Sequence, residues 1–304
     1  LGAYEAVLDV ATPSRQRAGD DAALEGLVEE LEAGTVGALV VAGCDPVTEA
    51  PGGRRLAAAL AKVALRVGLA EREDATTAGL EVVLPLPHAL EAWELLRGAW
   101  AELHHPRQTS MATPEASWRR ALSTGFVALD AGPSGARPFA AAGVPTVAPR
   151  GSIAATGRFG LALHATVGML GGRHAHNPWL HELPDPVTKQ VWGNAAALSP
   201  ATARALGVAD GDRVRVAAAD GAAVVLPVLA QPGLADRTVA IALGYGRLGT
   251  DRFAGVGPAW IEAVPTVRSG EAVGADASAL LRFVRGATSY DGREVTVERA
   301  GGRD

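Results

Sequence analysis

The stretch that decides the fold runs from His174 to Val216 and reads HAHNPWLHELPDPVTKQVWGNAAALSPATARALGVADGDRVRV. Its first half, residues 177–194, is rich in Asn, His, Trp, Pro, Asp and Lys and has no apolar period, so we expect a long ordered loop. The second half predicts a short helix. Ser199 is a good N-cap, Pro200 suits the first helical position, and Gly207 suits a left-handed C-cap.

Short strands separated by turns follow this helix. Val214 and Val216 alternate with arginines after the Asp-Gly-Asp turn at 210–212, a pattern typical of a half-buried strand. The Asp-Gly turn at 219–221 and the apolar run 224–228 predict a β-hairpin, and a further strand is expected at 239–243. Frequent turns and one small helix favour a compact β-barrel.

The motif N-x-W-L-x-E-L-P-D-P-x-T-K-x-x-W-x-N, followed by S-P-x-T-A-x-x-L-G-V-x-D-G-D-x-V, carries a family resemblance. It resembles the C-terminal domain of the molybdopterin oxidoreductase superfamily. The segment WLHELPDPVTK is similar in sequence to the molybdopterin-oxidoreductase-like component of alternative complex III, a quinol-oxidising respiratory complex. The resemblance implies that the predicted barrel is a double-psi β-barrel, the fold of the family's dinucleotide-binding domain.

Composition limits the classes of function. The chain has 304 residues, a net charge of −5 and one cysteine, Cys44. An acidic balance argues against a nucleic-acid partner, and we find no run of about 18 apolar residues that would span a membrane. A single cysteine cannot hold an iron–sulfur cluster alone or form a disulfide within the chain. Cys44 is expected to be a small buried residue. The chain starts at Leu1 without a visible signal peptide, and we interpret it as a fragment.

The N-terminal part predicts an α/β arrangement. Helical stripes are expected at 21–32 and 54–64, and short apolar strands at 37–42, 65–69 and 81–84. Strands that alternate with helices predict βαβ units and a parallel sheet. The fold class is therefore α/β: a Rossmann-like parallel-sheet domain followed by the double-psi β-barrel domain.

This part also resembles the superfamily, namely its third domain. The segments VAGCDPV and LRVGLAEREDATTAGLEVVLPLPHALEAWE carry the likeness, through matching positions Gly43, Cys44, Asp45, Pro46, Asp74, Thr76, Leu84, Pro85, His88 and Glu91. In cofactor-binding members, loops at these strand ends contact the pterin dinucleotide, in keeping with the general rule for such sheets. The alternative is that Gly43 and Pro46 only shape a turn.

Four segments are expected along the chain. Residues 1–105 form the Rossmann-like segment, 106–157 a linker with one short helix at 117–122, 158–268 the molybdopterin-dinucleotide-binding-like barrel, and 269–304 a C-terminal extension. The linker is interpreted from its many Pro, Gly, Ala and Ser residues.

Histidine clusters are the candidate metal ligands. His104 and His105 have no third ligand at helical spacing, which favours a solvated loop pair. His174, His176 and His181 lie within eight residues, but the irregular backbone between them favours hydrogen-bonded loop histidines. No catalytic residue and no metal ligand is predicted, and Asp185 between two prolines is interpreted as a turn residue.

The cofactor-binding candidates follow from the resemblance. The positions that match the family's pterin-binding loops are Gly43, Asp45, Asn177, Trp179, Asn194, Gly244 and Tyr245. At these positions the binding function is either retained or vestigial. The alternative to cofactor binding is that the aromatic and amide residues among them pack in the core and anchor loops. Tyr245 is predicted to be an exposed aromatic beside Arg247. Trp179 and Trp192 are predicted to hold the 177–194 loop against the seam between the α/β domain and the barrel.

The resemblance implies a scaffold in an electron-transfer complex, with no complete active site and no cofactor in this chain. Iron–sulfur clusters would lie elsewhere in the full-length protein. Expected partners are other respiratory subunits, including cytochrome c and integral membrane quinol-binding subunits, at the outer, periplasmic face of the cytoplasmic membrane. One alternative is the C-terminal half of a genuine molybdenum or tungsten bis-pterin oxidoreductase, polysulfide-reductase-like, with molybdopterin guanine dinucleotide. Another is a stand-alone β-barrel module that binds proteins.

Overall fold

The structure is a computed structural model, and it describes residues 19–87, 93–126, 157–254, 267–284 and 286–303. The chain divides into two compact units. One contains Leu1–Gly19 and Leu86–Ala148, and the other contains Asp20–Pro85 and Pro149–Asp304. The larger unit holds a parallel sheet and a closed barrel, in accord with the predicted mixed α/β class.

The parallel sheet has three strands in the order β1-β2-β3, with bounds Ala38–Ala42, Leu65–Ala70 and Val82–Pro85. Helices α1, α2 and α3 span Asp21–Ala33, Pro46–Glu49 and Gly53–Leu60, and the short 3-10 helix η1 spans Thr77–Gly79. Helix α1 begins where the Asp20 carboxylate accepts the Ala23 N–H at 3.0 Å, and it ends at Gly34, which is left-handed. The predicted strands and helices of this part are confirmed.

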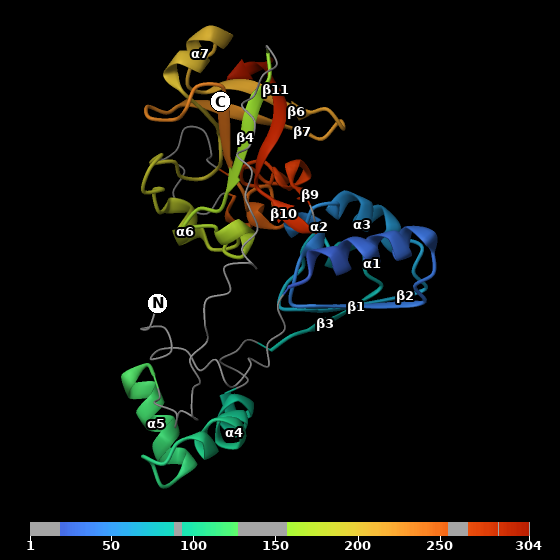
Figure 1. Cartoon of the computed structure of the whole chain (residues 1–304), viewed down its shortest axis with the longest axis vertical. Helices are drawn as coiled ribbons and strands as arrows, with labels where there is room; N and C mark the ends of the chain where they lie inside the picture. The colour runs from blue at the N-terminus through green and yellow to red at the C-terminus, as the bar shows by residue number, and fades with distance from the viewer. Residues whose placement is uncertain (1–18, 88–92, 127–156, 255–266, 285, 304) are drawn as a thin grey trace, which may run out of the picture. The chain divides into compact units, whose positions relative to one another are not determined.

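The helices α1 and α3 lie on one face of this sheet (Figure 1). Their apolar stripes form a core with Val28, Leu31, Leu39, Leu56, Ala59, Leu60 and Val63. The register pairs Val40 with Val67 and Val67 with Val82, so these three side chains share the opposite face. On that face Val40, Leu65, Val82 and Leu84 are exposed. Parallel sheets are usually covered on both faces, so this face is unusually apolar for one that meets solvent.

The barrel closes in the order β11-β4-β8-β5-β7-β6. The strands are β4 Phe159–His164, β5 Ala196–Leu198, β6 Asp212–Ala218, β7 Ala223–Ala230, β8 Thr238–Ala242 and β11 Asp291–Arg303. Pairs β4–β8 and β5–β7 are parallel and the other pairs are antiparallel. The predicted barrel is confirmed as a closed six-stranded barrel, and the double-psi topology stays a prediction.

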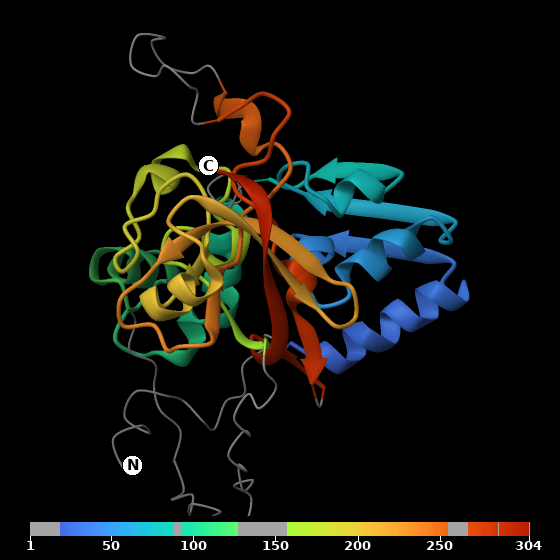
Figure 2. The ribbon, with the colours of Figure 1, turned by 90° about the horizontal axis from the view of Figure 1, so that it is seen from above.

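Alternating side chains fill the barrel. Inward positions on neighbouring strands are fully buried, among them Val214, Val216, Leu226, Val239, Ile241 and Val295. Strand β11 lies between β4 and β6, so residues 291–303, which the sequence assigns to a C-terminal extension, complete the barrel wall (Figure 2). A separate two-stranded ribbon, β9 Arg282–Val284 and β10 Ala287–Ser289, precedes β11. The 3-10 helices η4, η5 and η6 span Leu170–Gly172, Thr250–Phe253 and Ser278–Leu280.

Helix α7, Pro200–Leu206, confirms the prediction made from local sequence. The Ser199 hydroxyl accepts the Thr202 N–H at 3.0 Å, and Gly207 ends the helix with φ 66°. Ser199 and Gly207 therefore delimit the helix for the predicted reasons.

The predicted 177–194 loop is ordered, but it contains a helix, α6 Pro178–Glu182. Asn177 caps this helix by accepting the Trp179 N–H at 3.1 Å. The prediction that Trp179 packs across the seam is wrong, because its side chain is 81% exposed. In a helix of little more than one turn, the buried face is taken by His181, and Trp179 projects outward. Trp192 is half-buried and stacks on His181 of the same segment, so its packing against the seam stays a prediction.

The smaller unit contains α4 Trp93–Leu103, the 3-10 helix η2 His105–Arg107 and α5 Pro114–Thr124. Three indole rings pack together, with Trp118 against both Trp93 and Trp100 at 5.2 and 5.4 Å. The predicted helix at 117–122 is confirmed as part of α5, and residues 127–156 of the predicted linker lie outside the described residues, as do His88 and Glu91. Across the ranges that the structure describes, no helix combines the length and the apolar character needed to cross a membrane.

Candidate functional site

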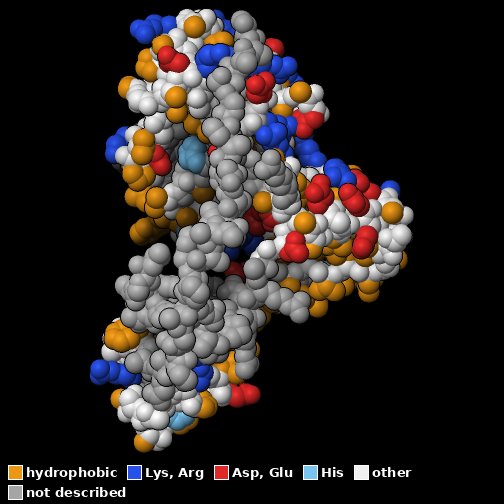
Figure 3. All heavy atoms as spheres, in the orientation of Figure 1, with side chains coloured by type: hydrophobic (Ala, Val, Ile, Leu, Met, Phe, Trp, Pro, Cys, Tyr) orange, Lys and Arg blue, Asp and Glu red, His pale blue; other side chains and the backbone are white. Residues whose placement is uncertain are grey.

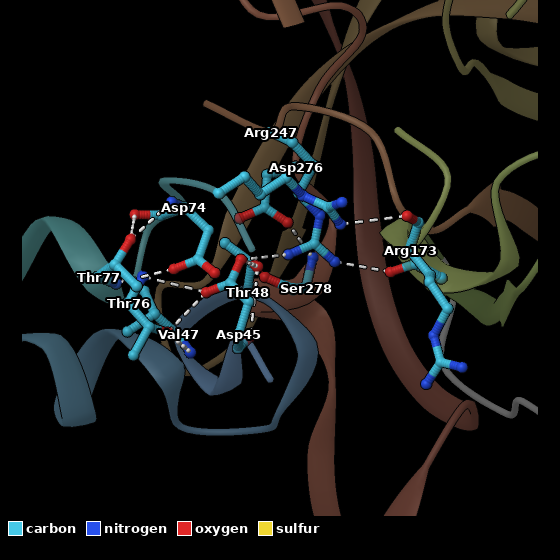
Figure 4. Close-up of polar contacts among 12 residues, drawn as sticks. Asp45, Val47, Thr48, Asp74, Thr76, Thr77, Arg173, Arg247, Asp276 and Ser278 are labelled. Atoms are coloured by element: carbon cyan, nitrogen blue, oxygen red, sulfur yellow. Dashed lines mark hydrogen bonds and ion pairs between the residues drawn. The ribbon is translucent and has the colours of Figure 1, made fainter. Parts of the chain in front are cut away.

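The candidate site lies where the parallel sheet meets the barrel inside the larger unit. We call it the seam network and define it as Asp45, Thr48, Thr76, Gly171 and Arg247 (Figure 4). Asp45 follows strand β1 through the turn at Gly43, whose φ is 64° and whose N–H donates to Leu69 O at 2.9 Å. The end of a parallel strand thus delivers a carboxylate to the barrel.

Both carboxylate oxygens of Asp45 are occupied by protein donors. Oδ1 accepts the Thr76 N–H at 3.1 Å and the Thr76 hydroxyl at 2.6 Å. Oδ2 accepts Arg247 Nη1 at 2.9 Å and the Thr48 hydroxyl. The two sequence segments that carry the N-terminal resemblance therefore meet through Asp45 and Thr76.

Arg247 comes from the loop after β8 and is only 6% exposed. Its Nη2 donates to Gly171 O at 2.6 Å, while the buried Nε has no hydrogen-bond partner among the described residues. Gly172 makes room for this guanidinium: its φ is 118°, and a Cβ there would overlap the Nη2, Nε and Cζ atoms. A Cβ at Gly244 would likewise overlap backbone atoms of Gly171 and Gly172. Glycine is thus required at 172 and 244 for the barrel loop at 171–172 to lie against the barrel loop at 244–247.

Three arginines converge on the carbonyl oxygens of residues 171–176. Arg247 donates to Gly171 O, Arg72 Nη2 donates to Arg173 O at 3.2 Å, and Arg252 Nη2 donates to His176 O. Arg72 comes from the sheet side and the other two from the barrel loops. This segment is therefore fixed from both layers.

The loop histidines hold the backbone. His174 Nδ1 lies 3.0 Å from Gly168 O, and His181 Nε2 lies 2.6 Å from Ala175 O. The His181 ring stacks on Trp192 at 5.1 Å and meets the edge of Tyr245 at 6.0 Å. No group of three or more His, Cys, Asp or Glu side chains placed to hold a metal occurs in the described ranges. For His174 and His181, the hydrogen-bonded interpretation is confirmed.

Burial controls the charge of these histidines. Desolvation is the largest cause that lowers the pKa of His176 to about 4, and the nearby Arg72 and Arg252 charges add to it. Desolvation also lowers the pKa of His181, against the opposing effect of its bond to Ala175 O. Both imidazoles are therefore neutral at pH 7, and their Nδ1 atoms are buried without a hydrogen-bond partner in the described structure.

Asn194, a predicted cofactor residue, has its amide fully engaged by the protein. Nδ2 donates to Ala242 O at 2.8 Å and to Ala275 O at 2.9 Å, and Oδ1 accepts the Ala275 N–H at 2.9 Å. The side chain joins the start of β5 to the end of β8 and to the 275 loop. A polar residue that fills such a position supports the backbone of neighbouring loops.

Two predictions about exposure are wrong. Tyr245 is only 9% exposed, because its ring packs in a small cluster with Met169, Ala175 and Val273, and burial raises the pKa of its hydroxyl. Cys44 is exposed rather than buried, since it lies in the turn that follows β1. In both cases the residue sits at a strand end, where local sequence does not reveal which side another layer will cover.

Three of the predicted site residues lie near one another. Asp45 pairs with Arg247, the Arg247 guanidinium lies against Gly172, and Gly172 lies against Gly244. Gly43 begins the turn that holds Asp45. The contacts of the described residues do not join Asn177 or Trp179 to this network. Sequence reasoning missed the partner of Asp45. The signals were the Gly-Gly-Arg at 171–173 and the Gly-Tyr-Gly-Arg at 244–247, where small residues flank cations.

A cavity of about 640 Å³ adjoins the seam network. Its lining includes Thr48, Glu49, His164, Arg173, Gly244 and Tyr290. It thus combines polar side chains, among them the Glu49 carboxylate and the Arg173 guanidinium, with an apolar wall, which is the make-up of small-molecule pockets. Burial lowers the pKa of His164, so this imidazole is neutral at pH 7.

Comparison with known families gives one match in this part of the chain. Residues 172–271 match the family described as Molydopterin dinucleotide binding domain. The matched range begins at Gly172 and includes Asn194, Gly244, Tyr245 and Arg247. It supports the molybdopterin oxidoreductase superfamily and a possible molybdopterin cofactor. The comparison with curated proteins gives no match.

Proposed function

We propose that this chain is a part of a molybdopterin-oxidoreductase-type protein that serves as a scaffold in a membrane-associated respiratory complex. The complex would be of the alternative complex III type and would oxidise quinol, and this region would hold no metal of its own. The superfamily match of residues 172–271 supports the general class. The segment WLHELPDPVTK at 179–189 supports, by resemblance, the assignment to the alternative complex III type.

The ion pair between Asp45 and Arg247 carries the proposal. By resemblance, cofactor-binding relatives use the loops at these strand ends to contact a pterin dinucleotide. Here Asp45 is saturated by Thr48, Thr76 and Arg247, and the Asn194 amide is saturated by backbone groups. These residues do not fit a dinucleotide bound at the seam, because each would first have to give up protein hydrogen bonds. Buried polar groups without partners are costly.

The proposed partners are the other subunits of the complex, including cytochrome c and integral membrane quinol-binding subunits. The proposed location is the outer face of the cytoplasmic membrane. In this setting the seam network would keep the two layers of the scaffold in one fixed orientation, which is the property that a scaffold for electron transfer needs.

The test is purification of the full-length gene product, tagged, from membranes. We expect membrane subunits and a cytochrome c to co-purify in fixed ratio. Molybdenum and tungsten, measured by mass spectrometry, and pterin, measured by fluorescence after oxidation, should be far below one per chain. Purified 1–304 should be colourless and free of iron. Near-stoichiometric molybdenum with pterin, or iron in 1–304, would overturn the scaffold proposal.

The second candidate is a bis-pterin oxidoreductase, and the cavity of about 640 Å³ favours it. Arg173 and His164 offer donors there without belonging to the seam network. If the full-length protein retains pterin, Arg173→Ala should reduce the pterin content, whereas Arg204→Ala on the exposed side of α7 should not. Unchanged pterin content in Arg173→Ala would place the cofactor elsewhere.

A further inference from the structure

We infer that the cavity of about 640 Å³ beside the seam network binds a small zwitterion with an apolar body, namely an apolar amino acid or a dipeptide made of such residues. The inference goes beyond the proposed function, which assigns no ligand to this chain. Under the scaffold proposal the cavity holds no cofactor and is free for another ligand.

The apolar part of the cavity is formed mainly by leucines. Leu163 in β4, Leu243 directly after β8 and Leu281 directly after η6 are buried side chains of its wall. Leu170 and Tyr290 line the same cavity but are 52% and 50% exposed. A ligand with an apolar body would cover these two side chains, and the removal of apolar surface from water is favourable.

Two charged side chains of opposite sign line the cavity. Glu49 is the last residue of α2 on the sheet side, and Arg173 follows η4 on the barrel side. Among the described residues, neither side chain forms a hydrogen bond or an ion pair. In Figure 4 the Arg173 guanidinium points away from the seam network, and no dashed line reaches it. A ligand carboxylate can therefore pair with Arg173 and a ligand ammonium group with Glu49.

The charge of the two layers agrees with this polarity. Figure 3 shows acidic side chains gathered over the lobe that carries α1 and α3, and basic side chains spread over the barrel lobe. The cavity takes part of its wall from each layer. A ligand that carries both charges is attracted by both parts of the wall, whereas an anion is repelled by Glu49 and a cation by Arg173.

The imidazole of His164 adds hydrogen-bonding capacity without adding charge. Desolvation lowers the pKa of His164 against the opposing effect of Asp185, so the ring is neutral at pH 7. A neutral imidazole donates one hydrogen bond and accepts another. The Thr48 hydroxyl is already engaged by Asp45. The charged groups of the wall are therefore one guanidinium and one carboxylate.

The volume admits more than one ligand of this chemistry. It lies within the range of about 300–1,000 Å³ that is usual for small-molecule pockets. An amino acid and a dipeptide carry the same two charges, but the dipeptide separates them by one further residue, about 3.8 Å along the chain. The experiment therefore compares these two sources.

Isothermal titration calorimetry with the full-length gene product measures the binding of leucine and of leucyl-leucine. We expect binding at one site per chain, and the tighter of the two probes identifies the charge separation that the cavity accepts. Isocaproate has the leucine side chain and carboxylate without the ammonium group, and isoamylamine has the ammonium group without the carboxylate. Both should bind about 10- to 100-fold more weakly than leucine, the effect of one lost charge-assisted hydrogen bond.

Variants of the cavity wall locate the two charges of the ligand. Glu49→Gln should remove the preference for leucine over isocaproate, and Arg173→Ala should remove the preference for leucine over isoamylamine. Ala165→Trp narrows the cavity without removing either charge and should also weaken binding. Glu29→Gln on α1 and Arg204→Ala on α7 change exposed residues outside the cavity and should bind like wild type. Unchanged melting temperatures verify that the variants are folded.

Four outcomes would overturn the inference. The first is that neither leucine nor leucyl-leucine binds at millimolar concentration. The second is that isocaproate binds as tightly as leucine, which would make the cavity an anion site. The third is that Ala165→Trp binds like wild type, which would place the ligand elsewhere. These three results leave the scaffold proposal standing, because that proposal is tested by co-purifying subunits and by metal content. The fourth is that the full-length protein retains near-stoichiometric pterin that Arg173→Ala releases, and this result overturns both.

Discussion

Arg247 Nη1 lies 2.9 Å from Asp45 Oδ2, although the two residues are 202 positions apart in the chain. Both side chains are nearly inaccessible to solvent. A buried ion pair gains little net stability over apolar packing, because both charges must be desolvated, but the loss of one partner leaves an uncompensated charge. The pair therefore fixes how the sheet and the barrel meet, more than it adds to their stability.

Arg247→Met is expected to lower the free energy of unfolding by about 3–5 kcal/mol, since Asp45 then stays buried without its counter-charge. Urea denaturation followed by circular dichroism measures this change. The double variant Asp45→Asn/Arg247→Met should lose less than the sum of the two single losses, because no charge remains uncompensated. Additive losses would show that the two groups do not interact.

Gly172→Ala and Gly171→Ala form a matched pair. Both positions have positive φ, but a Cβ at 171 meets nothing within 4 Å, while a Cβ at 172 overlaps the Arg247 guanidinium. Gly171→Ala should cost about 1–2 kcal/mol of backbone strain. Gly172→Ala should cost about 1–3 kcal/mol more, through overpacking. Thermal and urea unfolding of both variants measure the difference, and equal losses would contradict the packing at Gly172.

Ser199→Ala should destabilise the larger unit by roughly 1 kcal/mol, through the loss of the acceptor for the first turn of α7. Ser199→Thr keeps the acceptor oxygen and should lose less. Differential scanning calorimetry provides the comparison. A melting curve of Ser199→Ala that superimposes on that of wild type would mean that the cap does not stabilise the helix.

Stability should fall as the pH decreases from about 6.5, the pKa of a histidine in the unfolded chain, toward the pKa of about 4 of folded His176. In this window the unfolded state binds a proton at His176 that the folded state does not bind. The contribution of neutral His176 to the free energy of unfolding is therefore complete above pH 6.5 and is lost as the pH falls below it. His181 acts in the same direction.

Urea midpoints at pH 7.5, 6.5, 5.5 and 5.0 test this dependence. The range stops at 5.0 because the carboxylates Asp185 and Asp220, whose pKa values are lowered in the folded state, contribute only in more acidic solution. His176→Gln should reduce the slope. A wild-type midpoint that does not change over this range would refute the prediction.

Sequence alone predicts the elements whose causes are local. The helix between Ser199 and Gly207 is defined by its own caps, and the strand pattern of Val214 and Val216 is set by a two-residue period. The parallel sheet and the barrel follow from the order and length of such segments. The closing strand β11 is different, because its place in the barrel depends on pairing with the distant strands β4 and β6.

Features that depend on distant partners were not predictable. Trp179 and Tyr245 are both aromatic residues in polar stretches, yet one is exposed and the other buried. The difference arises because Tyr245 is covered by residues such as Met169 and Val273, while Trp179 is on the outer side of a one-turn helix. In the same way, the partner of Asp45 is a cation on a loop of the other layer, and the spacing of residues around Asp45 contains no sign of it.

The position of β11 has a consequence for synthesis of the protein. Strands β4 and β6 both pair with β11, whose residues 291–303 leave the ribosome last among the barrel strands. At about 5–20 residues per second, several seconds pass between the emergence of β6 and that of β11. During this time two strand edges of the nascent barrel are unpaired, and such edges recruit other chains. The newly made chain therefore passes through a stage in which chaperones have an open sheet to protect.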